Sequence, residues 1–272
     1  MFDEGLAQRA AHNLEKVRKK KPLIHSITNY VAMNYTANAL LACGASAVMA
    51  HGDEEVEEMV SLADALVLNL GTLTQARVET MIKAGKRANE KSIPVILDPV
   101  GSGATTLRTK AAKRLIQDLS IRVVRGNPSE ILSLSREGSA SKGVESLHLV
   151  DEAVEGGLKL AKSCALTVAV TGKVDFVTDG TRTCRVHNGH DMMKYVTGAG
   201  CAATSLIAAF VSVDPDPFEA TATALSCFGL AGEKAAEDQG GPGTFQIQLL
   251  DALYTMDAKK LKGGARIELP GR

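Results

Sequence analysis

The chain lacks an excess of charge of either sign. Its 272 residues include 31 Lys plus Arg and 31 Asp plus Glu, so the formal net charge at pH 7 is zero. Without a field of one sign, no nucleic acid and no anionic membrane surface is expected as a partner. The basic run at residues 18–21 is short and suits the negative C-terminal end of a helix. We therefore expect small-molecule partners.

Segments that direct a protein to a membrane are also lacking. Residues 1–21 are charged and contain no apolar core followed by a small-residue cleavage site, so they do not predict a secretory signal. No uninterrupted apolar run is long enough to span a bilayer. We expect a cytoplasmic protein without a membrane partner.

Cysteines are few and widely scattered. There are five, an odd number, and no two form a C-x-x-C pair, which argues against a disulfide framework and a structural zinc site. Four of them lie in apolar or strand-like surroundings, where a free cysteine usually behaves as a small buried hydrophobe. They are Cys43, Cys164, Cys184 and Cys227. Cys201 differs because it directly follows a glycine-rich turn.

Short apolar runs alternate with stretches that can form helices, a pattern typical of an α/β fold with a parallel sheet. The runs are residues 45–50, 64–71, 94–101, 121–127 and 166–172. Such strands need helices on both faces of the sheet. Residues 174–189 predict two further strands joined by Asp179-Gly180, a hairpin that would add an antiparallel edge. Helices are predicted afterwards, and the first of them, at residues 202–213, should be largely buried. We predict a single α/β domain over residues 1–272.

Polar residues end several of these strands, at the edge where parallel sheets bind ligands. Asp98, Arg125 and Thr171 end three runs, and Asn127 predicts the N-cap of a short helix that carries Glu130. Two acids at adjacent strand ends can hold Mg²⁺ beside a polyphosphate, and an arginine there can neutralise phosphate charge. Each residue alone also has an ordinary explanation as a turn former, a helix-dipole partner or an ion-pair member.

The turn at residues 198–201 opens a helix and permits three interpretations. Its bare N–H groups and the helix dipole attract an anion, so it can hold a phosphoryl group. Its G-x-G-x-x-A pattern also fits a dinucleotide-binding turn, although the preceding residues are polar and not a buried strand. A thiol nucleophile at Cys201 is the third interpretation, with His187 or His190 as the base.

A separate region near the N-terminus suggests a substrate site. Asn29 follows a short apolar run, and residues 31–41 have the small, apolar composition of a packed helix. Met49 ends a predicted strand. Its side chain is most simply core filler, but the polarizable thioether would also suit a flat heteroaromatic ligand.

Six segments, taken together, resemble the hydroxyethylthiazole kinase family of the ribokinase-like superfamily. They are residues 26–49, 97–103, 125–131, 169–175, 196–201 and 240–253. The match runs in order through nearly the whole chain. The resemblance implies a ribokinase-like sandwich and Mg²⁺-dependent transfer of the ATP γ-phosphoryl group to the hydroxyl of 4-methyl-5-(2-hydroxyethyl)thiazole, a step of thiamine salvage. It also implies a homotrimer with active sites between subunits.

The resemblance further implies roles for individual residues. Substrate contacts are implied for Asn29, Val31, Met49 and Gly198. ATP contacts are implied for Arg125 and Thr171, with Asp98 and Glu130 around Mg²⁺ and the phosphates. The implied anion hole and catalytic group consist of Gly198, Ala199, Gly200 and Cys201. Two positions depart from related sequences, since threonine commonly replaces Ala199 and many superfamily members have a catalytic aspartate in place of Cys201.

Phosphoryl transfer through a loose transition state depends mainly on alignment and charge neutralisation, so a cysteine can suffice where an aspartate is common. We expect the helix terminus to lower the pKa of the Cys201 thiol from its usual ~8.5 and so raise the thiolate fraction. We also expect the glycine turn to contribute more to the rate than Cys201 does.

Four alternatives stay open at this stage. The nearest is a kinase for a related vitamin alcohol, such as hydroxymethylpyrimidine or pyridoxal. The others are an NAD-dependent oxidoreductase that uses the turn at residues 198–203, a thiol hydrolase, and a non-catalytic thiazole sensor.

Overall fold

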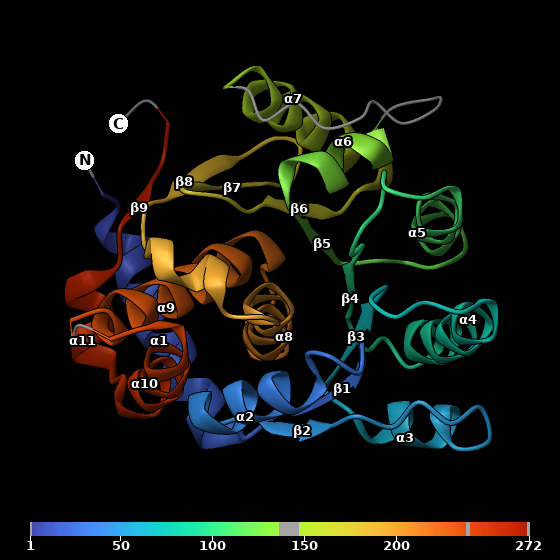
Figure 1. The fold of residues 1–272 in the computed structure, drawn as a ribbon, viewed down its shortest axis with the longest axis horizontal. Helices are drawn as coiled ribbons and strands as arrows, with labels where there is room; N and C mark the ends of the chain where they lie inside the picture. Colours follow the sequence, from blue (N-terminus) through green and yellow to red (C-terminus); the bar gives the residue numbers. More distant parts are fainter. Residues whose placement is uncertain (1, 136–146, 238–239, 271–272) are drawn as a thin grey trace.

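One nine-stranded sheet organises the protein in the computed structural model, which describes residues 2–135, 147–237 and 240–270 (Figure 1). The strand order is β2-β1-β3-β4-β5-β6-β7-β8-β9. The first six strands in that order are parallel to one another. They are β2 (Ser46–Val48), β1 (Leu23–Ile27), β3 (Ala65–Asn69), β4 (Val95–Asp98), β5 (Val123–Gly126) and β6 (Thr167–Val170). The predicted parallel sheet is therefore confirmed.

The remaining three strands form the antiparallel edge: β7 (Asp175–Thr178), β8 (Thr183–Val186) and β9 (Ile267–Glu268). The β7–β8 hairpin turns at Asp179, as predicted. Asp179 Oδ1 accepts hydrogen bonds from the N–H groups of Thr181 and Arg182, at 2.9 and 2.7 Å. Strand β9 was not predicted, because two residues carry no periodic signal and the pairing with β8 joins distant parts of the chain.

Helices cover both sides of the sheet (Figure 1). One side carries α1 (Glu4–Lys20), α2 (Met33–Cys43), α8 (Ala199–Val211), α9 (Pro217–Ala235), α10 (Pro242–Thr255) and α11 (Ala258–Gly264). The other carries α3 (Val56–Leu62), α4 (Gln75–Glu90), α5 (Thr106–Asp118), α6 (Pro128–Ser135) and α7 (Leu147–Cys164). A short 3₁₀ helix, η1 (Asp191–Tyr195), precedes α8.

Alternation along the strands divides the apolar side chains between the two helical layers. In β3, Val67 belongs to the core on the α8 side, whereas Leu66 and Leu68 belong to the core on the α4 side, and all three are buried. Because both faces are covered, the strand is continuously apolar. Helix α8 is buried over most of its length, between the sheet and α9, which confirms the prediction for this helix.

Two sequence-based expectations about single elements have different outcomes. The basic run does end a helix, since Arg18, Lys19 and Lys20 occupy the last turn of α1. Cys43, Cys184 and Cys227 are buried as expected, but Cys164 is exposed, because it is the last residue of α7 and lies at the surface end of that helix. Within the described residues, no helix combines the length and the apolar composition needed to cross a bilayer.

Candidate functional site

The C-terminal ends of the parallel strands meet the N-terminus of α8. Asn69 at the end of β3 lies in register with Asp98 at the end of β4, and the Asn69 Nδ2 donates to Asp98 Oδ2 at 2.9 Å. Thr204 of α8 donates from Oγ1 to the same oxygen at 2.9 Å. These bonds fix α8 against the strand ends, so the sequence-based prediction of a shared edge is confirmed.

Three side chains form a neutral group that we call the amide cluster: Asn29, Asn69 and Cys201. Asn29 Nδ2 donates to Asn69 Oδ1 at 2.9 Å and to Cys201 Sγ at 3.3 Å. Asn69 Nδ2 donates to the same sulfur at 3.2 Å. The N–H groups of Ala32 and Gly71 donate to the two amide oxygens, at 2.9 and 3.0 Å. The cluster is thus held rigid by bonds among its own members and the nearby backbone.

The Cys201 thiol does not have the low pKa expected at a helix N-terminus. Burial, and after it the negative charge of Asp98, raise the pKa to about 11, although the bonds from Asn69 and Asn29 and the charge of Arg125 act in the opposite direction. Desolvation outweighs the helix dipole here because it penalises the thiolate directly. At neutral pH the group is therefore a thiol, and the expectation of an enriched thiolate is wrong.

Asp98 is a buried carboxylate, with a relative exposure of 1%. Its pKa is raised to about 6, mainly by burial. The charge of Arg125 and the bonds from Thr204 and Asn69 oppose this rise, and the charge of Glu130 adds to it. Arg125 Nη1 lies 3.9 Å from Asp98 Oδ2. The carboxylate is therefore mostly ionised at neutral pH, but burial makes its ionised form less stable than it would be in water. A positive charge placed nearby would stabilise that form.

Glu130 caps the helix that carries it. Its backbone N–H donates to Asn127 Oδ1 at 2.9 Å, and its Oε2 accepts from the Asn127 N–H at 2.8 Å, which makes a capping box at the start of α6. Its Oε1 accepts from the Gly101 N–H at 2.8 Å and so ties down the loop after β4. The N-cap prediction for Asn127 is confirmed, and Glu130 has a structural task in addition to its proximity to Asp98.

Arg125 and Thr171, the two residues for which the resemblance implies ATP contacts, lie next to each other. Arg125 Nη2 donates to Thr171 Oγ1 at 2.5 Å. A Cβ added to Gly200 would come within 2.7 Å of Arg125 Nη1, so the guanidinium lies against the first turn of α8. A side chain at position 200 would therefore have to displace the Arg125 guanidinium.

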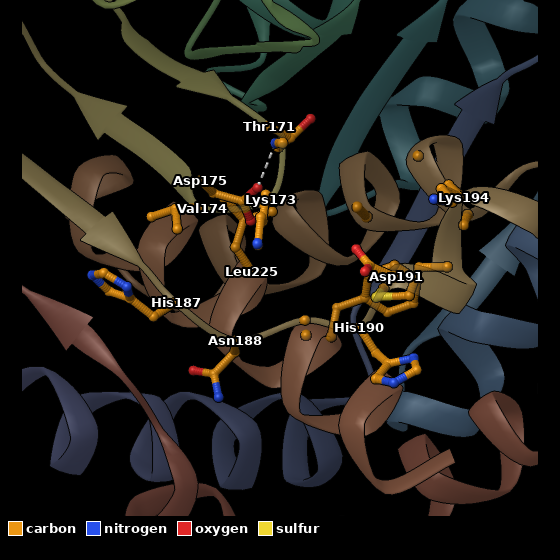
Figure 2. A pocket seen from close by; sticks show the side chains of 18 of the residues that line it. Thr171, Lys173, Val174, Asp175, His187, Asn188, His190, Asp191, Lys194 and Leu225 are labelled. Atoms are coloured by element: carbon orange, nitrogen blue, oxygen red, sulfur yellow. Dashed lines mark hydrogen bonds between the residues drawn. The ribbon is translucent and has the colours of Figure 1, made fainter. Parts of the chain in front are cut away.

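Both residues line a cavity of about 730 Å³. We call it the nucleotide cavity, after the ATP contacts that the family resemblance implies for Arg125 and Thr171. Its wall also includes the turn between β6 and β7, residues 187–191, 193 and 194, the start of α8 and one face of α9. Figure 2 shows Lys173 and Asp175 on one side of this pocket, with His190 and Asp191 on another. Leu225 and Phe228 supply apolar surface. An arginine, lysines and apolar side chains in one cavity suit a ligand with a polyanionic part and a ring.

The backbone at the start of α8 is arranged for close contact. Gly198 has φ +86°, a conformation that side chains rarely adopt, and a Cβ there would lie 3.0 Å from the Ala32 side chain. The Ala199 N–H already donates to the Val196 carbonyl at 3.1 Å, and the first helical bond joins the Ala202 N–H to the Gly198 carbonyl at 2.8 Å. The N–H groups of Gly200 and Cys201 thus precede the first closed turn, where helix N–H groups lack helical partners. Ala199 is less suited to the anion hole than its two neighbours.

The other two residues predicted for the substrate site differ in exposure, since Met49 is partly buried and Val31 is exposed. Met49 directly follows β2 and packs, partly buried, against the core on the α8 side. Val31 is 65% exposed on the isolated chain, and the neighbouring Tyr30 is 63% exposed.

From the sequence, no role was assigned to four residues of this region: Thr204, Lys173, Asp175 and Asn188. Thr204 lies one helical turn beyond Gly200. Lys173 and Asp175 lie in residues 169–175, one of the segments that resemble the kinase family. The sequence positions of these three residues could therefore have suggested a place in the site.

Comparison with known proteins agrees with this geometry. The sequence pattern of the hydroxyethylthiazole kinase family matches residues 14–259. A hydroxyethylthiazole kinase from Desulfotalea psychrophila is 54% identical over 259 residues, which are 95% of each chain. The chain belongs to the hydroxyethylthiazole kinase family.

Solved structures extend the comparison. The structure of hydroxyethylthiazole kinase from Pyrococcus horikoshii OT3 has a TM-score of 0.88 at 43% identity, covering 96% of this chain and 98% of its own. A ribokinase-like superfamily protein from Enterococcus faecalis V583 has a TM-score of 0.67 at 13% identity, covering 92% and 94% of the two chains. The second likeness is one of fold alone, and it confirms the predicted ribokinase-like architecture.

Membership in the hydroxyethylthiazole kinase family makes the protein an ATP-dependent phosphotransferase with an alcohol acceptor. The structure also disfavours two alternatives. The turn at residues 198–203 follows the 3₁₀ helix η1 instead of a buried strand, which is not the context of a dinucleotide-binding turn. The amide partners of Cys201 cannot act as a base, so they do not make a thiol nucleophile.

Proposed function

We propose that the chain phosphorylates the hydroxyl of hydroxyethylthiazole with ATP at the start of α8. The observation that carries this proposal is the position of that helix end between two different surroundings. Ala199 and Gly200 line the nucleotide cavity, while Cys201 belongs to the amide cluster. ATP then approaches from the cavity and the alcohol from the cluster, so that the transferred group lies between them.

In this proposal the nucleotide cavity binds ATP, with Arg125 and Thr171 on its phosphates. The hydrogen bond between these two side chains directs the guanidinium toward the first turn of α8. Lys173 adds positive charge from the neighbouring turn. Because these positive side chains are already in place before the reaction, they neutralise the phosphate oxygens without having to move as the phosphoryl group transfers.

The γ-phosphoryl group binds the N–H groups of Gly200 and Cys201. Both precede the first closed turn of α8, at the positive end of the helix dipole. As the phosphoryl group transfers, these donors stay in place and stabilise the charge on its oxygens. Gly198 gives the chain the turn that exposes them, and Ala199 acts through the backbone conformation alone.

The residues around Asp98 fit a magnesium ion. The pair of carboxylates supplies oxygen ligands only, which Mg²⁺ prefers. A nearby cation would also stabilise the ionised form of the buried Asp98. Each Glu130 oxygen accepts one backbone N–H and keeps a second lone pair, which could contact the ion or one of its water molecules. Asp98 and Glu130 would hold the ion, which when bound neutralises phosphate charge. Among the described residues, no three His, Cys, Asp or Glu side chains gather as an independent metal site.

On the other side of α8, the thiazole alcohol lies against the amide cluster. Cys201 orients the hydroxyl as a thiol, and Asn29 contributes the free lone pair of its amide oxygen. Met49 and Gly198 contact the thiazole ring in this arrangement, with Val31 at the margin. A neutral alcohol suits this side because the cluster carries no formal charge.

A homotrimer would complete the substrate side. The exposed Tyr30 and Val31 follow Asn29 directly, and β2 forms the open edge of the sheet beside Met49. Apolar side chains and an open strand edge are features that a second subunit can cover. Native mass spectrometry tests this: a trimer supports the proposal and a stable active monomer contradicts it.

The activity is tested by incubating the protein with ATP, Mg²⁺ and one of three alcohols: hydroxyethylthiazole, hydroxymethylpyrimidine or pyridoxal. The expected result is ADP and thiazole phosphate, identified by mass, with the highest kcat/KM for the thiazole. A higher kcat/KM for either other alcohol would assign a different substrate. Binding of the thiazole without ADP release would indicate a sensor.

A further inference from the structure

One wall of the nucleotide cavity is an irregular stretch of chain. Residues 187–190 follow β8 and line the cavity before η1 begins. The His187 N–H donates to the Arg266 carbonyl at 2.9 Å and so continues the pairing of β8 with β9. The position of residues 188–190 depends on contacts from other elements. Those contacts come from α9 and from the C-terminal segment.

The Asn188 side chain is fully occupied with such contacts. Its Nδ2 donates to Glu233 Oε1 at 3.1 Å and to the Gly264 carbonyl at 2.9 Å. Its Oδ1 accepts from Ser226 Oγ at 2.8 Å and from the Arg266 N–H at 2.7 Å. The residue is 4% exposed, and Figure 2 shows its side chain directed away from Lys173 and Asp175. Asn188 therefore anchors the wall from behind.

Glu233 and Arg266 form the second part of this anchor. Arg266 makes a two-pronged ion pair with Glu233, with distances of 2.9 and 2.7 Å. Glu233 Oε1 also accepts from the Gly189 N–H at 2.8 Å, and Arg266 Nη2 donates to the His187 carbonyl at 2.9 Å. The two charged side chains thus hold the backbone on both sides of Asn188.

The wall also lies directly on α9. A Cβ added to Gly229 would come within 2.5 Å of the Asn188 carbonyl oxygen. Gly229, Leu225 and Phe228 line the same cavity, so the backbone of the wall and this face of α9 form one continuous surface. A small displacement of residues 187–189 would change the width of the cavity.

We propose that Arg266, Glu233 and Asn188 are positioning residues that set nucleotide affinity from behind the cavity wall. Arg266 and Glu233 are not among the described residues that line the cavity, so they act through the backbone they hold. The proposal rests on the proposed function, because it takes this cavity as the site of ATP. A wall held in the bound conformation before binding saves the cost of ordering it afterwards.

Arg266→Ala is the decisive variant, with Arg266→Lys as a conservative partner that keeps the charge and loses the two-pronged geometry. Arg114→Ala is the matched control, because Arg114 makes a similar two-pronged pair with Glu79, at 2.6 and 2.9 Å, on helices at the other side of the sheet. The measurements are the Kd of a non-hydrolysable ATP analogue by calorimetry, KM for both substrates, and Tm.

We expect Arg266→Ala to raise the Kd of the analogue and KM for ATP about tenfold, with KM for the thiazole changed less than twofold. Arg266→Lys should be intermediate, and Arg114→Ala should change neither KM. A Kd within twofold of the original in Arg266→Ala, or an equal rise in both KM values, would overturn the proposal. If Arg266→Ala does not fold, Arg266→Lys and Glu233→Gln carry the same comparison.

Two further variants separate this inference from the proposed function. Lys173→Ala and Arg125→Ala change side chains that line the cavity itself. If neither weakens binding of the analogue, the cavity is not the nucleotide site and the proposed function fails. If both weaken it while Arg266→Ala does not, the proposed function stands and the role of the three positioning residues is wrong.

Discussion

The two sides of the first turn of α8 use their polar groups in opposite ways. In the amide cluster, Asn29 and Asn69 bond to each other, to Cys201 and to the backbone, and the cluster has no formal charge. In the nucleotide cavity, charged side chains such as Arg125 and Lys173 line open space. The first side is closed and its three side chains are neutral, although Asn69 also bonds the buried carboxylate of Asp98. The second side is open and charged.

This difference suits the two substrates of a kinase. A polyanion is held by charges that face an empty cavity, because they replace the counterions and water that it loses. A neutral alcohol needs rigid alignment more than charge, and a cluster whose members fix one another supplies it. The helix end between them belongs to both sides, so each variant should affect one substrate more than the other.

The largest expected effect comes from removing the charge on the cavity side. Arg125→Ala should lower kcat/KM for ATP about 100- to 1,000-fold, because transition-state charge on the phosphoryl group loses its partner. The Kd for the thiazole, measured by calorimetry without nucleotide, should change less than threefold. A parallel loss of thiazole affinity would show that the two sides are not separate.

A smaller effect is expected from opening the amide cluster. Asn69→Ala should lower the free energy of unfolding by about 1–3 kcal/mol, because Asn29 and the Gly71 N–H lose a buried partner. KM for the thiazole should rise more than KM for ATP. Chemical denaturation and steady-state kinetics measure the two effects. Unchanged thiazole kinetics in a destabilised protein would mean that the cluster serves the fold alone.

The smallest effect is the pH dependence contributed by Asp98. Its pKa in the folded chain is raised to about 6, so in the window between the unfolded value of 3.8 and this pH the folded chain binds the proton more tightly. Stability contributed by the protonated form is therefore lost as pH rises through this window, by about 2 kcal/mol of the roughly 3 kcal/mol that the whole shift represents.

Asp98→Asn should flatten that part of the stability curve, which chemical denaturation at pH 4.5 and pH 7 measures. Asp175 has a similarly raised pKa of about 6 and remains in both proteins, so the difference between the two curves isolates Asp98. Identical slopes for Asp98→Asn and the original chain would contradict the assigned burial effect.

The fold could be predicted largely from local patterns. Apolar runs such as residues 64–71 and 94–101 each encode a buried strand, and the Asp179-Gly180 pair encodes a turn, so neighbouring residues carry the information. Strand β9 has two residues and exists only because β8 is beside it. This pairing joins residues about 80 positions apart, so no local sequence pattern predicts it.

The candidate site was predictable in position but not in electrostatics. Strand-end residues such as Asp98 and Arg125 had to share one edge of a parallel sheet, and they do. The pKa of Cys201 was predicted with the wrong sign, because desolvation and the charge of Asp98 are tertiary effects that the helix dipole alone does not include. The role of Asn188 could not be predicted, since its partners lie 38 to 78 residues away.

The central claim is that backbone donors at the start of α8 contribute more to phosphoryl transfer than the Cys201 side chain. The most direct test compares kcat, at saturating ATP and hydroxyethylthiazole, for Gly198→Ala and Cys201→Ser. Gly198→Ala strains the turn at φ +86° and should lower kcat about 100-fold or more, whereas Cys201→Ser keeps the turn and should lower it about tenfold or less. Equal losses, or a greater loss in Cys201→Ser, would contradict the claim.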